Sequence, residues 1–537
     1  MTHEQIQILA DTDQVELGDS QVVEPQRIGA SSSGMVATQH HCATEAGKEI
    51  LKRGGNAIDA AIAASLALGV CEPAASGIGG QTMMLIHTAE PRRTFALDGS
   101  SRAPNRANAE LFSNKGDRLK GHLASTVPST LATLEYARKE YGTMDLGDLL
   151  EPSIKLAKDG FAVSPLLNRL TKRELNSLKK GSAASLFLNS KSRPFPIASK
   201  FQQPVLAKTY TRLAKYGCED FYQGLIGKKI HKDMQANGGL INADDLAQIP
   251  FPVERKPVSC NFDGMRVITF PPPGAGRTLI EMLNIYEHLS KSNRLPDTPL
   301  GAITLAEVIR RAFLDRRDRP YDPTFYAQID DKRMVNKDYA KKVAYLLRKR
   351  IKTQGETTHL STMDKAGNVV ALTQSIERVF GACAASPDLG FLYNNYMSAF
   401  EYEDISHPYY MRPNACPWAS VAPTIVFHGR NPWLSIGSPG SDRIAPSILQ
   451  VLLRMQKMSP FDAVSAPRLH CRINGEVSLE LTRMRSDIPD ALRKRGFTIK
   501  QRDPFSFYHG CVQLVMKEKG KFIGIADPRR DGSAAGP

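Results

Sequence analysis

The stretch Gly355-Glu-Thr-Thr-His-Leu-Ser-Thr-Met-Asp-Lys-Ala-Gly-Asn-Val-Val-Ala-Leu-Thr-Gln-Ser375 is typical of a β-hairpin. Two β-prone runs flank Asp364-Lys-Ala-Gly-Asn368, whose Gly and Asn tolerate positive φ. A regular hairpin centred on Ala366 places Thr357 and Ser375 opposite each other on one face, with Cβ atoms ~5 Å apart. A bulge in the turn would shift this register by one residue. Periodicity alone also fits a Thr-rich surface hairpin.

Short sequence blocks elsewhere in the chain carry a second signal, both in their residues and in their order along the chain. They are Gly54-Gly-Asn-Ala-Ile-Asp-Ala60, Glu72-Pro73 with Ser76-Gly-Ile-Gly-Gly80, Asn237-Gly-Gly-Leu-Ile241, Pro271-Pro-Pro273, Ala422-Pro-Thr-Ile425, Gly437-Ser-Pro-Gly440, Ala466-Pro-Arg468 and Asp527-Pro-Arg529. With Glu356-Thr-Thr-His359, they resemble the γ-glutamyltranspeptidase family over residues 35–530. The resemblance implies an N-terminal-nucleophile hydrolase, an α/β fold with four layers, α/β/β/α.

The resemblance also implies how the chain is divided. Residues 1–34 are expected to form a flexible N-terminal extension, 35–356 the large-subunit portion and 357–537 the small-subunit portion. Both portions build one catalytic domain after self-cleavage, and the two fragments remain associated. Composition agrees with a globular protein, because 42% of the 537 residues are hydrophobic and 23% are charged.

The start of the chain shows no secretory signal. Its first 26 residues are polar and acidic, without a basic start or an apolar core. The longest apolar stretch, residues 57–71, carries Asp59 and is too short to span a bilayer. We therefore expect a cytoplasmic protein without a membrane partner.

The eight cysteines show no C-x-x-C motif and no Cys/His spacing of the kind that separates metal ligands. This pattern argues against a disulfide framework and against a structural zinc site. We expect no metal and no other cofactor.

The net charge of +15 raises the alternative of a module that binds nucleic acid or another anionic surface. The densest basic run, residues 341–352, interleaves with apolar residues at helical spacing. That pattern predicts the solvated face of an amphipathic helix. No nucleic-acid motif accompanies it, so we expect no nucleic-acid partner.

The family resemblance implies self-cleavage between Glu356 and Thr357. The new N-terminal Thr357 would then be the nucleophile and form an acyl intermediate. Its α-amino group, with an ordinary pKa of about 7.7–8.0, can take the hydroxyl proton without a His or Asp relay. The alternative is an uncleaved pseudoenzyme.

Further catalytic roles follow from the same resemblance. Ser375 stands where relatives usually carry a Thr beside the nucleophile. Gly440 and Ser441 match the turn whose successive backbone N–H groups form an oxyanion hole. Relatives have Gly-Gly there, so Ser441 has to adopt a backbone conformation that suits glycine. His359 falls on the face of Thr357, and considered alone it is structural.

The substrate end departs from the family pattern. Relatives hold the α-carboxylate of a γ-glutamyl group with an Arg, but this chain has Ser100 at that position and Arg102 two residues on. The paired serines of relatives are replaced by Ala419-Ser420. The positions that hold the α-amino group read Glu377, Tyr396 and Ala399.

These replacements predict a small-molecule amide substrate that lacks the glutamyl α-amino group. Oxamate and amides of the glutaryl type are candidates, with hydrolysis or acyl transfer as the reaction. The alternative is an ordinary glutathione hydrolase or γ-glutamyltransferase with a rearranged pocket.

Overall fold

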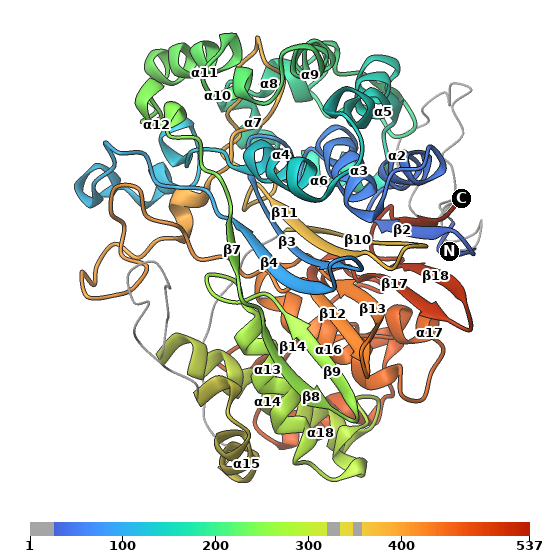
Figure 1. The fold of residues 1–537 in the computed structure, drawn as a ribbon. Helices are drawn as coiled ribbons and strands as arrows, with labels where there is room; N and C mark the ends of the chain where they lie inside the picture. Colours follow the sequence, from blue (N-terminus) through green and yellow to red (C-terminus); the bar gives the residue numbers. More distant parts are fainter. Residues whose placement is uncertain (1–25, 319–332, 347–356) are drawn as a thin grey trace.

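Two β-sheets lie face to face between two layers of helices (Figure 1). The structure is a computed structural model that describes residues 26–318, 333–346 and 357–537. Glu356, one side of the expected cleavage site, lies outside the described residues. The layered arrangement confirms the α/β/β/α sandwich that the resemblance implied.

The first sheet is antiparallel throughout and contains the predicted hairpin at its centre. Its strands, in spatial order, are β19 (Ser533–Ala535), β2 (Gly34–Thr38), β10 (Thr358–Asp364), β11 (Val369–Ser375), β3 (Gln81–Thr88), β4 (Arg93–Gly99) and β7 (Val253–Arg255). Thr358 pairs with Gln374 and His359 with Thr373. The register about Ala366 is therefore confirmed, without a bulge.

The second sheet also has seven antiparallel strands. They are, in order, β1 (Ile28–Ser31), β18 (Lys521–Ala526), β17 (Gln513–Glu518), β13 (Asn431–Gly437), β12 (Thr424–His428), β9 (Met265–Thr269) and β8 (Val258–Phe262). Strand β1 falls inside the predicted extension 1–34, so that boundary is wrong for residues 28–31. Pairing with β18 supplies the hydrogen bonds that hold this segment in the sheet.

One helical layer covers the first sheet (Figure 1). It comprises α2 (His41–Lys52), α3 (Ala57–Cys71), α4 (Thr130–Tyr141), α5 (Leu146–Asp159), α6 (Pro165–Arg173), α7 (Leu175–Lys180), α8 (Ala184–Phe187), α9 (Pro204–Tyr216), α10 (Glu219–Tyr222), α11 (Leu225–Ala236) and α12 (Ala243–Ala247), with the short strands β5 (Phe161–Ala162) and β6 (Lys200–Phe201). Helix α3 is buried along its whole length because its many alanines allow close approach. Asn56 and Asp59 form a capping box that fixes its start.

The other helical layer covers the second sheet (Figure 1). It comprises α13 (Gly276–Glu287), α14 (Pro299–Asp318), α15 (Lys337–Leu346), α16 (Ile444–Arg454), α17 (Pro460–Ser465) and α18 (Asp487–Lys494), beside a small sheet of β14 (Leu469–Cys471), β15 (Glu476–Leu479) and β16 (Thr498–Gln501). Helix α15 buries Val343 and exposes Lys341 and Lys342, as an amphipathic helix does. The rest of the basic run lies outside the described residues.

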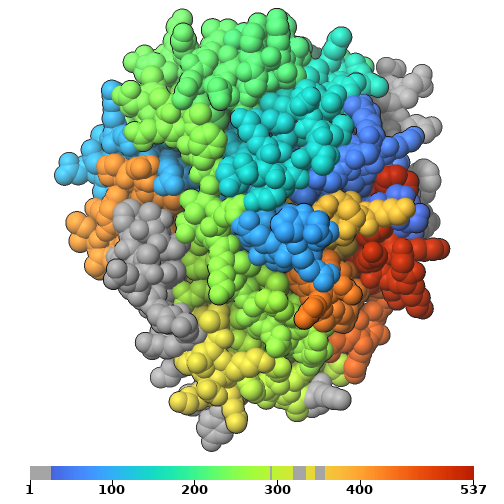
Figure 2. Space-filling view, viewed as in Figure 1, coloured from blue at the N-terminus to red at the C-terminus, as the bar shows by residue number. Residues whose placement is uncertain are grey.

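Both sheets mix strands from before and after residue 357. Strand β2 lies between β10 and β19, and β1 lies beside β18. In Figure 2 the C-terminal segment, in red, accordingly lies against the N-terminal one, in blue. Neither expected portion can form either sheet alone.

Among the described residues, no helix has the length and apolar character needed to cross a membrane.

Candidate functional site

A row of polar residues crosses the first sheet at one end. Ser375 pairs with Gln81 across β11 and β3. One further step along the neighbouring ladders brings Thr357 opposite Ser375 and Ser100 opposite Gln81. With strands 4.7–4.9 Å apart, Ser100 lies about 14 Å from Thr357. Residues of one row share a face of the sheet. Met83, two residues after Gln81 on the same strand, has the same face as Gln81, and its side chain packs in the core between the two sheets. The row therefore faces the second sheet.

Three buried residues, Gln39, Glu72 and Arg530, form a hydrogen-bonded group at the backbone of Thr357, which we call the clamp. Arg530 donates hydrogen bonds to the Thr357 carbonyl at 3.2 Å, to Gln39 Oε1 at 2.8 Å and to Glu72 Oε1 at 2.6 Å. The Thr358 hydroxyl donates to Gln39 Oε1 at 2.8 Å and also to Glu72. Burial raises the pKa of the Glu72 carboxyl, and the charge of Arg530 opposes that shift. The clamp fixes the backbone at the start of β10.

The hydroxyl of Thr357 is not engaged in a hydrogen bond with any described residue. Thr357 is 4% exposed. Ser375 Oγ, on the opposite strand, accepts a hydrogen bond from the Glu377 N–H at 2.8 Å. Burial raises the pKa of the Tyr396 phenol, and the neighbouring Ser375 and Gln81 side chains oppose that shift. Ser375 therefore lies between the predicted nucleophile and the predicted substrate-binding residue Tyr396.

The turn after β13 presents two backbone donors. It leads into the short helix η7 (Ser441–Arg443), with Gly440 at φ 115° and Ser441 at φ 50°. Ser441 thus adopts the left-handed backbone conformation expected at this position, where relatives carry the second Gly of Gly-Gly. Both residues are buried, and neither N–H donates a hydrogen bond to any described residue. Buried N–H groups without a partner are rare, so this pair is suited to receive a ligand oxygen.

His359 joins the two sheets. Its ring nitrogens bond with Thr373 Oγ1 at 2.9 Å and Ser361 Oγ at 3.2 Å, and Ser361 in turn meets Ser435 of β13 at 3.0 Å. Burial lowers the pKa of His359 to about 3, so the ring is neutral. It lies on the face of Thr357, as predicted, and its contacts are structural.

Glu377 combines strain with a shifted pKa. Its φ of 75° is left-handed, which is rare for a residue other than glycine. Burial raises the pKa of this carboxyl to about 7, the Arg378 charge opposes the shift, and Asp442 adds to it. Asp442 directly follows Ser441, so the carboxyl lies near the turn of unpaired N–H groups. Near neutral pH it is only partly ionised.

Two asparagines position the loop that carries Tyr396. Asn394 Oδ1 accepts hydrogen bonds from the Tyr396 N–H at 3.0 Å and the Thr126 hydroxyl at 2.8 Å. Asn395 Oδ1 accepts from the Arg378 N–H at 3.1 Å. These bonds tie the loop to the segment that follows β11.

The remaining predicted substrate residues are only partly brought together. Ser420 Oγ lies 3.3 Å from Ser441 Oγ, next to the turn. The Ser100 hydroxyl donates to Asp98 at 2.6 Å, and Asp98 is also paired with Arg255. Arg102 donates to the backbone carbonyl of Asn414 at 3.4 Å instead of joining the row.

The sequence profile of the family described as gamma-glutamyltranspeptidase matches residues 43–537. This chain belongs to the γ-glutamyltranspeptidase family. A relative from Bacillus subtilis (strain 168), named glutathione hydrolase proenzyme, is 31% identical and aligns over 96% of this chain and 93% of its own length. A Pseudomonas sp. (strain SE83) relative, named acylase ACY 1 proenzyme, is also 31% identical, over 94% and 93%.

A solved structure shares the whole fold. Cephalosporin acylase from Bacillus halodurans superposes with a TM-score of 0.88 at 27% identity, covering 97% of this chain and 99% of that one. Relatives of this γ-glutamyltranspeptidase family member thus include both glutathione hydrolases and acylases, and those named above from sequence are proenzymes.

Sequence reasoning missed the clamp in this γ-glutamyltranspeptidase family member. Glu72-Pro73 and Asp527-Pro-Arg529 were recognised as blocks, but no role was assigned to Glu72, Gln39 or Arg530. The available signal was a Glu at the end of the long apolar run 57–71, because a buried carboxylate requires a partner.

Proposed function

We propose that this chain cuts itself between Glu356 and Thr357, and that Thr357 then serves as the nucleophile of an amide hydrolase or acyltransferase. The observation that carries the proposal is the pair of buried N–H groups at Gly440 and Ser441, which have no acceptor among the described residues. They follow β13, whose last residue Gly437 lies against the His359 ring, two residues from Thr357.

Self-cleavage would begin with attack of the Thr357 hydroxyl on the Glu356 carbonyl. The C–N bond to Thr357 breaks, which frees the α-amino group and leaves Glu356 as an ester on the Thr357 hydroxyl. Water then hydrolyses this ester, which releases the Glu356 carboxylate and restores the hydroxyl. The clamp supports this step, because Arg530 holds the carbonyl on the other side of Thr357. The fragments 1–356 and 357–537 stay associated since each sheet contains strands of both.

In turnover, the α-amino group takes the hydroxyl proton while Oγ attacks the substrate carbonyl. The oxyanion accepts hydrogen bonds from the N–H groups of Gly440 and Ser441. In comparable hydrolases each such donor stabilises the transition state by about 2.7–4 kcal/mol. The proton then passes to the leaving amine. Water or a second amine removes the acyl group from Thr357, which gives hydrolysis or transfer. Ser375 orients the attacking hydroxyl.

We propose a small amide other than a γ-glutamyl compound as the substrate. A γ-glutamyl group carries an α-carboxylate and an α-ammonium, and both require paired charges when they are buried. The Ser100 hydroxyl is bonded to Asp98, and Arg102 to a backbone carbonyl. At the amino end, the Tyr396 phenol is buried beside Ser375 and Gln81, and Glu377 is partly neutral. An acyl group without the α-ammonium, such as glutaryl or oxamyl, avoids the second of these mismatches.

The second candidate is a glutathione hydrolase. The Bacillus subtilis relative that carries this name aligns with almost the whole chain. Under this candidate, Glu377 would ionise when it receives the α-ammonium. Efficient hydrolysis of glutathione would favour it over the non-glutamyl substrate while leaving the nucleophile assignment intact.

A denaturing gel with N-terminal sequencing tests the proposed nucleophile. The purified protein should resolve into two fragments, the smaller one starting Thr357-Thr-His. Thr357→Ala should remain full length, while Thr357→Ser, which keeps a hydroxyl, should still cleave. A Thr357→Ala protein that cleaves at the same bond would overturn the assignment.

A further inference from the structure

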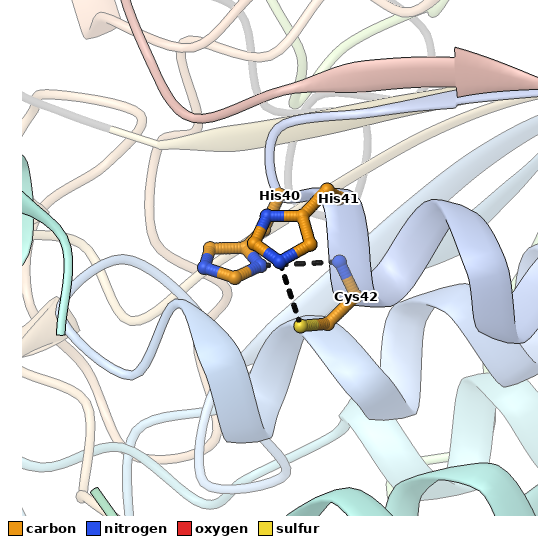
Figure 3. Close-up of side chains that lie close together, drawn as sticks. All are labelled: His40, His41 and Cys42. Carbon is orange, nitrogen blue, oxygen red and sulfur yellow. Dashed lines mark hydrogen bonds between the residues drawn. The ribbon is translucent and has the colours of Figure 1, made fainter. Parts of the chain in front are cut away.

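Two histidines and a cysteine follow one another where the chain leaves β2 and begins α2 (Figure 3). One donor atom from each of His40, His41 and Cys42 lies within 4.8 Å of the others. His41 Nε2 is 3.3 Å from Cys42 Sγ, and the two imidazole rings stack with centroids 4.5 Å apart. The proposed amide chemistry uses none of these side chains.

We infer that this cluster binds one divalent ion of the zinc type. Zinc binds Cys sulfur at about 2.3 Å and His nitrogen at about 2.0–2.1 Å, which in a tetrahedral site puts a sulfur and a nitrogen about 3.6 Å apart. The His41–Cys42 pair is already close to that spacing. Two nitrogens bound to one tetrahedral ion lie about 3.4 Å apart, so the His40 donor has to approach the pair by up to about 1.4 Å. The stacked imidazoles also have to turn so that both nitrogen lone pairs point at the ion.

The cluster combines a fixed ligand with an accessible side. His40 is 3% exposed and packs edge-on against Phe161, with ring centroids 5.5 Å apart. Its Nδ1 accepts the Cys42 N–H at 3.3 Å, which is longer than the usual range for such a bond. His41 and Cys42 are partly exposed, so an ion can enter from their side.

Charge and protons balance on binding. The Cys42 thiol loses its proton to solvent, both imidazoles remain neutral, and one proton is released for each ion bound. The thiolate supplies one negative charge beside the dication. Asp531, whose backbone carbonyl accepts the His41 N–H at 3.2 Å, carries a carboxylate that acts electrostatically on His41. These negative charges offset the positive end of the α2 dipole.

The position of the cluster links it to the catalytic centre. Gln39, directly before His40, is the clamp residue that accepts hydrogen bonds from Thr358 and Arg530. An ion bound at the cluster would therefore sit one residue away from the clamp.

Cobalt is a suitable probe because thiolate ligation gives it a strong near-ultraviolet charge-transfer band. All eight cysteines lie in the described ranges; Cys42 is partly exposed and the other seven are buried. Untagged protein titrated with cobalt should develop this band at one ion per chain, and zinc should remove it. Cys42→Ser should abolish the band, and His41→Asn should weaken cobalt binding at least about tenfold.

His428→Asn, at an exposed histidine far along the chain in β12, provides the matched control and should leave the band and the affinity unchanged. Circular dichroism checks that each variant is folded. The proposal is overturned if folded wild-type protein shows no charge-transfer band, or if the band persists in Cys42→Ser.

Discussion

The imidazole of His359 occupies the space that a side chain at Gly437 would need. A Cβ built on Gly437 would lie 2.2 Å from His359 Cε1 and 2.4 Å from its Nδ1. The two sheets therefore approach each other closely at a point two residues from the predicted nucleophile and three from the turn that carries the unpaired N–H groups. This contact lies between the strand that carries Thr357 and the turn that carries Gly440 and Ser441.

Gly437→Ala should consequently be destabilising and should also slow catalysis. Overpacking of a dense core typically costs about 1–3 kcal/mol. We expect a lower thermal midpoint together with slower self-cleavage. Gly147→Ala is the matched control, because a Cβ there meets no atom closer than 3.9 Å and lies in helix α5. Equal midpoints for both variants would contradict the close approach.

Ser375→Ala should reduce turnover without unfolding the protein. A typical hydrogen bond contributes about 0.5–1.5 kcal/mol, which corresponds to a loss of about 3- to 10-fold in kcat. Ser375→Thr keeps the hydroxyl and should retain most of the activity. Steady-state kinetics on any amide that the wild type hydrolyses provides the measurement. Wild-type kcat in Ser375→Ala would remove Ser375 from the mechanism.

Arg530→Lys tests whether the clamp positions Thr357. Lysine keeps the charge beside Glu72 but cannot reach Gln39, Glu72 and the Thr357 carbonyl together. Losing one charge-assisted hydrogen bond of about 1.5–3 kcal/mol should slow self-cleavage at least about tenfold. The rate is read from the decay of full-length protein on gels. Arg430→Lys, at an exposed turn, should behave as wild type; slow cleavage in that control would point to a general effect of the substitution.

Glu377 should make stability fall as the pH rises. Its pKa is raised from the ordinary 4.5 to about 7 in the folded chain, so its contribution to stability is complete below the unfolded value and is lost as the pH rises through 7. Because of the Glu377 carboxyl, the uncleaved Thr357→Ala chain should have a higher thermal midpoint near pH 5 than near pH 8. Glu377→Gln should flatten that difference. An unchanged pH dependence would show that Glu377 ionises normally.

Glutaryl-p-nitroanilide should be a better substrate than γ-glutamyl-p-nitroanilide. The two differ by one α-ammonium, and the carboxyl at the matching position, Glu377, is only partly ionised near neutral pH. An unpaired charge contact can cost about 2–5 kcal/mol, so a preference of at least about tenfold in kcat/KM is expected. Release of p-nitroaniline from both compounds measures it, and a preference for the γ-glutamyl compound would favour the glutathione hydrolase.

The central hairpin could be predicted because its information is local. The turn residues 364–368 and the β-prone runs beside them agree, and together they fix the register. The cap of α3 is local in the same sense. By contrast, Glu72 and Arg530 are 458 residues apart in sequence, and only the completed sheets bring them together.

Two further features escaped prediction for physical reasons. Strand β1 has four residues at the edge of a sheet, and such a short run carries too little pattern to distinguish it from an extension. The cluster at His40 consists of consecutive residues, whereas metal motifs are recognised by the gaps between their ligands.

The interleaving of strands determines whether the two fragments of a cleaved chain could separate and exchange partners. If the chain is cut before Thr357, strand β2 of the larger fragment remains between β10 and β19 of the smaller one. The two pieces then cannot part without dismantling both sheets, so dissociation and unfolding are the same event. Each mature molecule keeps the two halves of a single translation product for its lifetime. Mixing two differently labelled populations of mature protein would yield no hybrids.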